Sequence, residues 1–141
     1  MAMTVKMDAL SLEAAQLVLG AALARAGEMG KAFCVCVADP AGEPVLAARM
    51  DGAPRLSAQI AANKAWTVAS FNGMPTHVWW GAIENEPALV HGITHTPRLV
   101  VFGGGVPVVV GGAVVGSVGV SGGSADEDRD VAESGAAAVA D

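Results

Sequence analysis

The chain has 141 residues, of which 52% are hydrophobic, and a formal net charge of −6. This length and composition suit one domain with a sizeable core. No cluster of Lys or Arg is present, which argues against nucleic acid or an anionic membrane surface as a partner. The first residues lack the apolar core and cleavage site of a signal peptide, so we expect a cytoplasmic protein.

A helix is predicted near the start of the chain. Ser11 is a suitable N-cap, and apolar residues recur at helical spacing from Leu12 to Ala26. Gly27 or Gly30 is a suitable end for this helix. We expect its leucine side to pack on a sheet.

Two strands joined by a tight turn follow. Residues 31–38 form a continuous apolar run typical of a buried strand, residues 39–42 match a type I turn, and residues 43–50 predict the returning strand. Cys34 and Cys36 point to the same side of the first strand, a spacing too strained for an ordinary disulfide. We therefore expect two buried thiols.

The next predicted element is an alanine-rich helix over residues 55–71, with Pro54 suited to its first turn. Small side chains allow such a helix to lie close to a sheet or to another helix. Lys64 lies in the middle of this helix. The simplest interpretation of Lys64 is a solvated lysine whose stem runs along the surface.

Residues 73–97 form an irregular connection that gathers functional side chains. They include His77, His91, His95, Trp79 and Trp80. Connections between rigid elements commonly form binding sites, although tryptophans also cover cores and subunit interfaces. The glycine and threonines around His91 and His95 disfavour a helix there, so a zinc site is not favoured. A single histidine as axial ligand of haem iron needs no such spacing.

The longest apolar stretch, residues 99–120, contains no charged residue. Gly111 and Gly112 predict a two-residue hairpin turn between strands at 106–110 and 113–120. Because both faces of this hairpin are apolar, helices or another subunit must cover them. The predicted cross-strand pairs are Val110 with Ala113, Val109 with Val114, and Val108 with Val115.

A last helix is predicted from Ser124 to Val139. Ser124 and Glu127 fit a capping box, and the acids of the first turn suit the positive end of a helix. Glycines before a helix can hold a phosphate, but these carboxylates would repel it. The pattern therefore argues against nucleotide binding.

Four motifs in this order carry a resemblance to a known family. They are RMDGA at 49–53, Lys64-Ala65 and Phe71 in the alanine-rich helix, GGGVPV at 103–108, and the run at 116–132. Together they resemble the GlcG/HbpS family and the C-terminal part of PduO-type proteins. The resemblance implies a single profilin-like α/β (α+β) domain over residues 1–141, with an antiparallel sheet of about five strands flanked by helices. It also implies a homo-oligomer, from a dimer up to an octamer.

The resemblance implies a protein that binds a small molecule, either haem or a related planar ligand. A histidine of the irregular connection would ligate the iron, and a tryptophan would pack on the ring. The candidate ligand-binding residues are Trp79, Trp80, His95, Ser121 and Gly122, and the candidate axial ligands are His77 and His91. No other cofactor is expected.

One alternative is a non-catalytic structural partner of a larger enzyme, and another is a small catabolic enzyme. It would be a lyase, isomerase or hydrolase acting on an aromatic or small carboxylate substrate at a subunit-interface pocket, or a haem-degrading enzyme. Arg49 would pair with the substrate carboxylate through its planar fork. Lys64 or a histidine would act as general acid or base, and Asp51 is a further candidate catalytic residue.

Overall fold

Four strands form one antiparallel sheet in the order β2-β1-β4-β3. The computed structural model describes all residues from 1 to 141. The elements are α1 (Leu12–Met29), β1 (Cys34–Ala38), β2 (Pro44–Arg49), α2 (Leu56–Ser70), the 3-10 turn η1 (Thr76–Val78), α3 (Trp79–Ile83), α4 (Pro87–Ile93), β3 (Gly105–Val110), β4 (Ala113–Ser121) and α5 (Ala125–Ala137). The α+β class is confirmed, and the expected number of about five strands is corrected to four.

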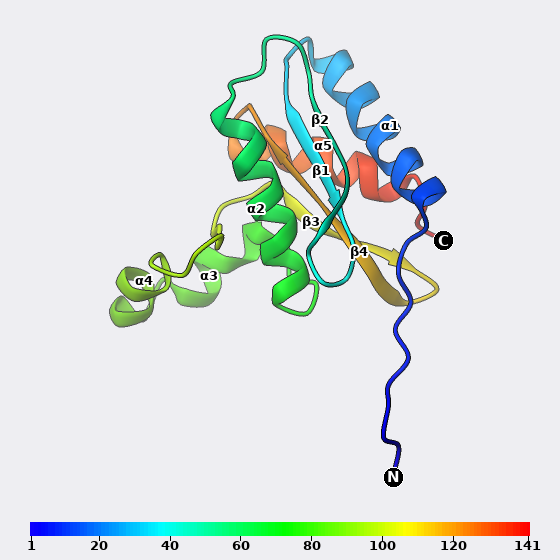
Figure 1. Cartoon of the computed structure of the whole chain (residues 1–141). Helices are drawn as coiled ribbons and strands as arrows, with labels where there is room; N and C mark the ends of the chain where they lie inside the picture. Colours follow the sequence, from blue (N-terminus) through cyan, green and yellow to red (C-terminus); the bar gives the residue numbers. More distant parts are fainter.

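Helices cover both faces of the sheet (Figure 1). α2 packs on one face, against β1 and β4, whereas α1 and α5 pack together on the other face. α3 and α4 project away from this body beside α2, and the N-terminal residues extend away from it. The apolar hairpin of β3 and β4 thus receives its cover from helices of its own chain.

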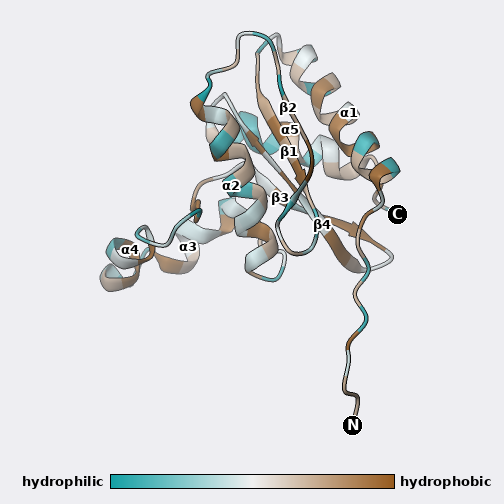
Figure 2. Ribbon diagram, viewed as in Figure 1, coloured by the Kyte–Doolittle hydropathy of each residue, from teal (hydrophilic) through white to brown (hydrophobic).

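The larger hydrophobic core lies between the sheet and the helices α1 and α5. A smaller core beneath α2 contains Cys34, Cys36 and Ala61. Figure 2 shows the strands hydrophobic along most of their length, whereas hydrophilic residues lie on the helices. None of the helices combines the length and the apolar character that crossing a bilayer requires.

α1 buries small side chains rather than leucines. Its buried residues are Ala15, Val18, Ala22 and Ala26. Leu12 is 55% exposed, while Leu19 and Leu23 are partly buried beside the core. The expected face is confirmed in position, but small residues form its centre and Leu19 and Leu23 lie at its margin, because α1 lies too close to α5 for larger residues. A Cβ atom added to Gly135 of α5 would lie only 3.1 Å from the Cβ atom of Ala22.

The predicted helix caps are confirmed. The Ser11 side chain accepts a hydrogen bond from Ala14 N, and α1 ends at Gly30, which has a left-handed φ of 68°. At α5, Ser124 and Glu127 form a capping box. Glu127 N donates to Ser124 Oγ at 3.2 Å, and Ser124 N donates to Glu127 Oε1 at 2.9 Å.

The β1–β2 hairpin closes through the predicted turn. Gly42 N donates to Asp39 O at 2.9 Å, and the Asp39 carboxylate accepts two further backbone bonds. Cys34 and Cys36 are free, buried thiols, as expected. Burial raises the pKa of Cys36 to about 11, so this thiol stays protonated and unreactive at neutral pH.

The β3–β4 hairpin has the predicted turn but a different register beyond it. Two predicted pairs are confirmed, Val110 with Ala113 and Val109 with Val114. Val108 pairs with Gly116 rather than with Val115, because β4 carries one extra residue in a β-bulge. Only glycine fits at position 116, since a Cβ atom there would overlap Ala38 O and the Leu10 side chain.

The alanine-rich α2 lies in close contact with β4, as its composition predicted. A Cβ atom added to Gly119 would overlap the carbonyl oxygen of Ala61. Nearby, the Ser117 hydroxyl donates to Ala65 O at 2.7 Å. This close approach places Lys64, between these two contacts on α2, against the end of β4.

Candidate ligand-binding site

An apolar groove of about 400 Å³ lies at the β3 edge of the sheet, between η1 and α5. We call it the His77 groove. Its lining residues are Pro75, His77, Val106, Pro107, Val109, Glu133, Ala136, Ala137 and Ala140. A mostly apolar cavity of this size with one or two polar groups is typical of small-molecule sites.

Packing around η1 fixes the backbone at His77. The buried Thr76 side chain accepts a hydrogen bond from Gly105 N at 2.9 Å, which ties η1 to the start of β3. A Cβ atom added to Gly103 would lie 3.3 Å from His77 Cβ. Gly103 therefore allows the chain to pass close beside the histidine.

The His77 imidazole is neutral and lacks a protein partner for one nitrogen. Nδ1 is buried and has no hydrogen bond. Burial lowers the pKa of His77, the positive charge of Arg129 lowers it further, and Glu133 acts in the opposite direction. A neutral imidazole is the form that binds metal ions. His77 therefore combines an imidazole whose charged form is disfavoured with a place in the lining of an apolar groove.

His91 and His95 have different surroundings. The expectation that no helix forms there is wrong for His91, which lies in α4 (residues 87–93), but α4 ends before His95, so the two histidines do not share one helix. Both histidines are exposed, and neither lines the His77 groove. The structure also contains no group of three or more metal-ligating side chains.

The two tryptophans of this segment differ in exposure. Trp79 is buried, and its ring centroid lies 4.9 Å from that of Phe71. Its indole Nε1 is buried without a hydrogen-bond partner. Trp80 is 54% exposed. Neither ring lines the His77 groove.

Lys64 forms a buried ion pair, so the interpretation as a solvated lysine is wrong. Its side chain is 0% exposed, and Nζ lies 2.9 Å from Asp128 Oδ2 and 2.8 Å from Val120 O. The other oxygen of Asp128 accepts a bond of 2.9 Å from Gly123 N. Burial lowers the pKa of Lys64, and the Asp128 carboxylate opposes this shift.

The segment before β3 covers the Lys64 ammonium. A Cβ atom at Gly104 would lie 2.6 Å from Nζ, so only glycine fits there. The Phe102 ring, itself 50% exposed, lies over the ammonium at 5.0 Å from Nζ to the ring centroid. Lys64 accordingly lines neither the His77 groove nor the cleft at Arg49.

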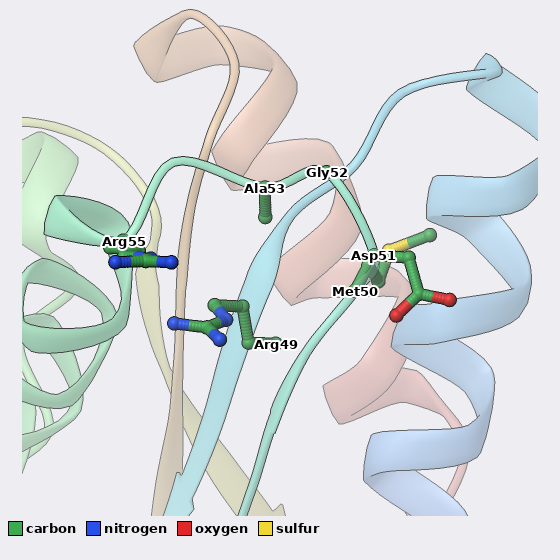
Figure 3. A pocket seen from close by; sticks show the side chains of 6 residues that line it. All are labelled: Arg49, Met50, Asp51, Gly52, Ala53 and Arg55. Atoms are coloured by element: carbon green, nitrogen blue, oxygen red, sulfur yellow. The ribbon is translucent and has the colours of Figure 1, made fainter.

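Arg49 and Asp51 line a separate cleft of about 370 Å³, at the end of β2. We call it the Arg49 cleft. In Figure 3, Arg49 and Arg55 extend on one side of the connecting loop, whereas the Asp51 carboxylate extends on the opposite side, toward α1. Because β2 and β3 are the two edges of the sheet, the Arg49 cleft and the His77 groove lie at opposite edges.

Ser121 and Gly122 pack against the β1 side of the molecule. Ser121 is buried and pairs with Cys34 in the sheet. A Cβ atom at Gly122 would lie 2.8 Å from Ala32 O. Neither residue lines the His77 groove or the Arg49 cleft.

Two charged residues at these sites, Asp128 and Arg55, were not predicted from the sequence. Asp128 belongs to a run of acids that was attributed to the helix start alone. Its spacing to the buried residues Val131, Ala132 and Gly135 places it on the inner face of α5, and this signal could have identified it. Arg55 approaches Arg49 only because residues 50–54 reverse the chain, and no local pattern shows this.

A four-stranded antiparallel sheet with helices on both faces and an apolar groove at one edge defines a class of small α+β domains. The chain belongs to the HbpS-like family of haem-degrading proteins, whose family model matches residues 10–137. This confirms the family resemblance seen in the sequence motifs.

Individual relatives match almost the whole chain. A 15.0 kDa protein from the dhaT-dhaS intergenic region of Citrobacter freundii is 38% identical over 126 residues, covering 88% of this chain and 87% of that protein. The crystal structure of Klebsiella pneumoniae ORFY superposes with a TM-score of 0.91 at 33% identity, covering 99% of this chain and 96% of that chain.

Two further matches concern PduO. The corrinoid adenosyltransferase PduO of Citrobacter freundii is 33% identical over 120 residues, which are 84% of this chain but only 36% of that protein. The chain thus spans about a third of PduO. The crystal structure of a complex of PduOC with haem superposes with a TM-score of 0.84 at 31% identity, covering 93% of this chain and 95% of that chain.

Proposed function

We propose that this protein binds haem or a related planar ligand in the His77 groove, with the His77 imidazole as axial ligand. The observation that carries this proposal is the position of His77, with a lowered pKa, in the lining of an apolar groove. The haem complex of the similar PduOC domain supports it.

The residues of the groove fit such a ligand. Val106, Pro107 and Val109 offer an apolar wall for the ring, and the alanines of α5 leave the opposite side open. Haem would supply a redox-active iron at this position. His77 would hold the iron, and the apolar wall would exclude water from that side of the ring.

His77 is favoured over His91 and His95 by its surroundings. The two other histidines are exposed on α4 and just after it, and neither lines the His77 groove. At an exposed histidine, water would compete with the imidazole for the iron. His77 is the histidine that lines the apolar groove and whose pKa is lowered.

The geometry favours binding over the alternative of a small catabolic enzyme. That mechanism requires Arg49 and either Lys64 or a histidine around one substrate. Lys64 is enclosed with Asp128, and His77 lies at the opposite sheet edge from Arg49. No single cavity of one chain therefore holds this set of groups.

A homo-oligomer remains part of the proposal. Phe71, Trp80 and Phe102 are each about half exposed, and such apolar side chains on a small domain commonly mark contacts with another subunit. Light scattering coupled to size-exclusion chromatography measures this directly. A mass above that of a monomer is expected.

A haem titration followed by visible spectroscopy tests the function. We expect a saturable, sharp Soret band with the wild-type protein, and a loss of at least about tenfold in affinity for His77→Ala, since one axial bond disappears. His91→Ala and His95→Ala are matched controls on exposed residues of the same type and are expected to behave as the wild type.

Two results would contradict the proposal. One is a weak spectral change that does not saturate in any variant, which would show adventitious haem. The other is unchanged affinity and an unchanged Soret band in His77→Ala. Circular dichroism of each variant establishes that the comparison is made between folded proteins.

A further inference from the structure

The Arg49 cleft is a second concave site, independent of the His77 groove. Its lining comes from the end of β2, the connecting loop and the start of α2: Arg49, Met50, Asp51, Gly52, Ala53 and Arg55. Figure 3 shows the Arg49 and Arg55 side chains on the same side of this loop. Two guanidinium groups thus share one cleft.

Neither arginine has a carboxylate partner. The chain has eight Lys and Arg residues. Four of them form ion pairs: Arg25, Lys31, Lys64 and Arg129. Arg98 lies over the Trp66 ring, at 4.3 Å from the ring centroid. The three that remain are Lys6, Arg49 and Arg55, and two of these three line the same cleft.

The Asp51 carboxylate lines the cleft without neutralising the arginines. It forms no ion pair with either of them, and in Figure 3 it extends toward α1, away from both guanidinium groups. The start of α2 adds no negative charge, because its first turn contains no acidic residue. The Arg49 side of the cleft therefore presents positive charge alone.

Arg49 also lines an adjoining apolar hollow of about 180 Å³. The other residues around this hollow are Cys34, Val35, Ala47, Ala48 and Ala58. Cys34 is the cross-strand neighbour of Arg49 in the β1–β2 ladder, so both project from the same face of the sheet. The cationic cleft and the apolar hollow thus meet at Arg49.

We propose that the Arg49 cleft binds a small organic carboxylate with a compact apolar body. The carboxylate would lie between the Arg49 and Arg55 guanidinium groups, whose fork geometry matches two carboxylate oxygens. The apolar body would occupy the hollow beside Cys34 and Ala58. A phosphate group alone would leave this hollow unfilled.

Isothermal titration calorimetry with benzoate and with benzamide tests this site. Benzamide has nearly the same shape but no charge. We expect saturable binding of benzoate, binding of benzamide weaker by about tenfold or more, and a similar loss of benzoate affinity in Arg49→Gln and Arg55→Gln. Lys6→Gln removes an equally unpaired positive charge outside the cleft and is expected to leave benzoate binding unchanged.

The outcomes separate this site from the haem site. Arg49→Gln should retain the haem titration of the wild type, and His77→Ala should retain its benzoate titration. No saturable binding of benzoate, equal binding of benzamide, or full benzoate binding by Arg49→Gln would overturn the carboxylate site. None of these results depends on haem.

Discussion

Lys64 and Arg49 were both predicted from the sequence as candidate catalytic residues, yet their surroundings are opposite. Lys64 lies on α2 against β4, is 0% exposed, and has Asp128 and Val120 as partners at 2.9 and 2.8 Å. Arg49 ends the edge strand β2, is exposed, and pairs with no carboxylate of the chain.

The Lys64 charge stabilises the fold, whereas the Arg49 charge has no partner within the chain and is available to a ligand. Breaking a buried ion pair leaves an uncompensated charge in the core, which is strongly destabilising. Removing an exposed, unpaired cation costs little. We therefore expect stability to depend on Lys64 and Asp128, and ligand affinity to depend on Arg49 and His77.

The largest expected effect is a loss of stability when Lys64 is deprived of its partner Asp128. Asp128→Ala leaves the ammonium buried beside one carbonyl, so the free energy of unfolding should fall by about 3–5 kcal/mol. Urea unfolding measures this loss. Asp126→Ala removes an exposed acid from the same turn of α5 and should cost at most about 1 kcal/mol. Equal urea midpoints for both variants would rule out a stabilising role of the pair.

The second effect concerns the charge of His77. Its pKa lies below the usual value of about 6.5, because burial and Arg129 disfavour the imidazolium. The imidazole is therefore mostly neutral at pH 7 and above, and acidification should begin to reduce haem affinity at a lower pH than for a histidine of ordinary pKa. Below the lowered pKa, protons compete with iron, and affinity should fall by about tenfold per pH unit.

Haem titrations from neutral to acidic pH check the prediction. His91→Ala is the control and should give the same profile as the wild type. A profile that begins to fall well above pH 6.5 would mean that a group other than a buried histidine controls haem binding.

The smallest expected effect is that of Arg49 on stability. Arg49→Gln removes no hydrogen bond or ion pair within the chain, so the free energy of unfolding should change by no more than about 0.5 kcal/mol. Urea unfolding in parallel with Asp128→Ala provides the direct contrast. A loss comparable to that of Asp128→Ala would mean that Arg49 has a structural partner after all.

Much of the fold could be predicted from local signals. Ser11 and Ser124 cap the helices that their sequence positions indicated, and the Gly111-Gly112 turn forms as expected. The bulge at Val115 could not be predicted, because no local pattern marks it, and the close approach of Ala38 and Leu10 to Gly116 beside it comes from distant parts of the chain.

The candidate sites were harder to predict because each depends on distant segments. Lys64 and Asp128 are 64 residues apart, so an alanine-rich helix alone gave no sign that its lysine was buried. The choice among the three histidines likewise required β3 and α5, whose side chains form the groove beside His77. Sequence identified the candidate residue types, whereas the tertiary fold distinguishes their surroundings.

The most direct test of haem ligation by His77 is chemical rescue of the axial ligand. His77→Gly leaves a space beside the groove, and free imidazole can enter it and bind the iron. We expect His77→Gly to lose the sharp Soret band of the haem-loaded protein, and millimolar imidazole to restore the band with saturable dependence, as an axial ligand would. A wild-type Soret band in His77→Gly without imidazole would contradict haem ligation by His77.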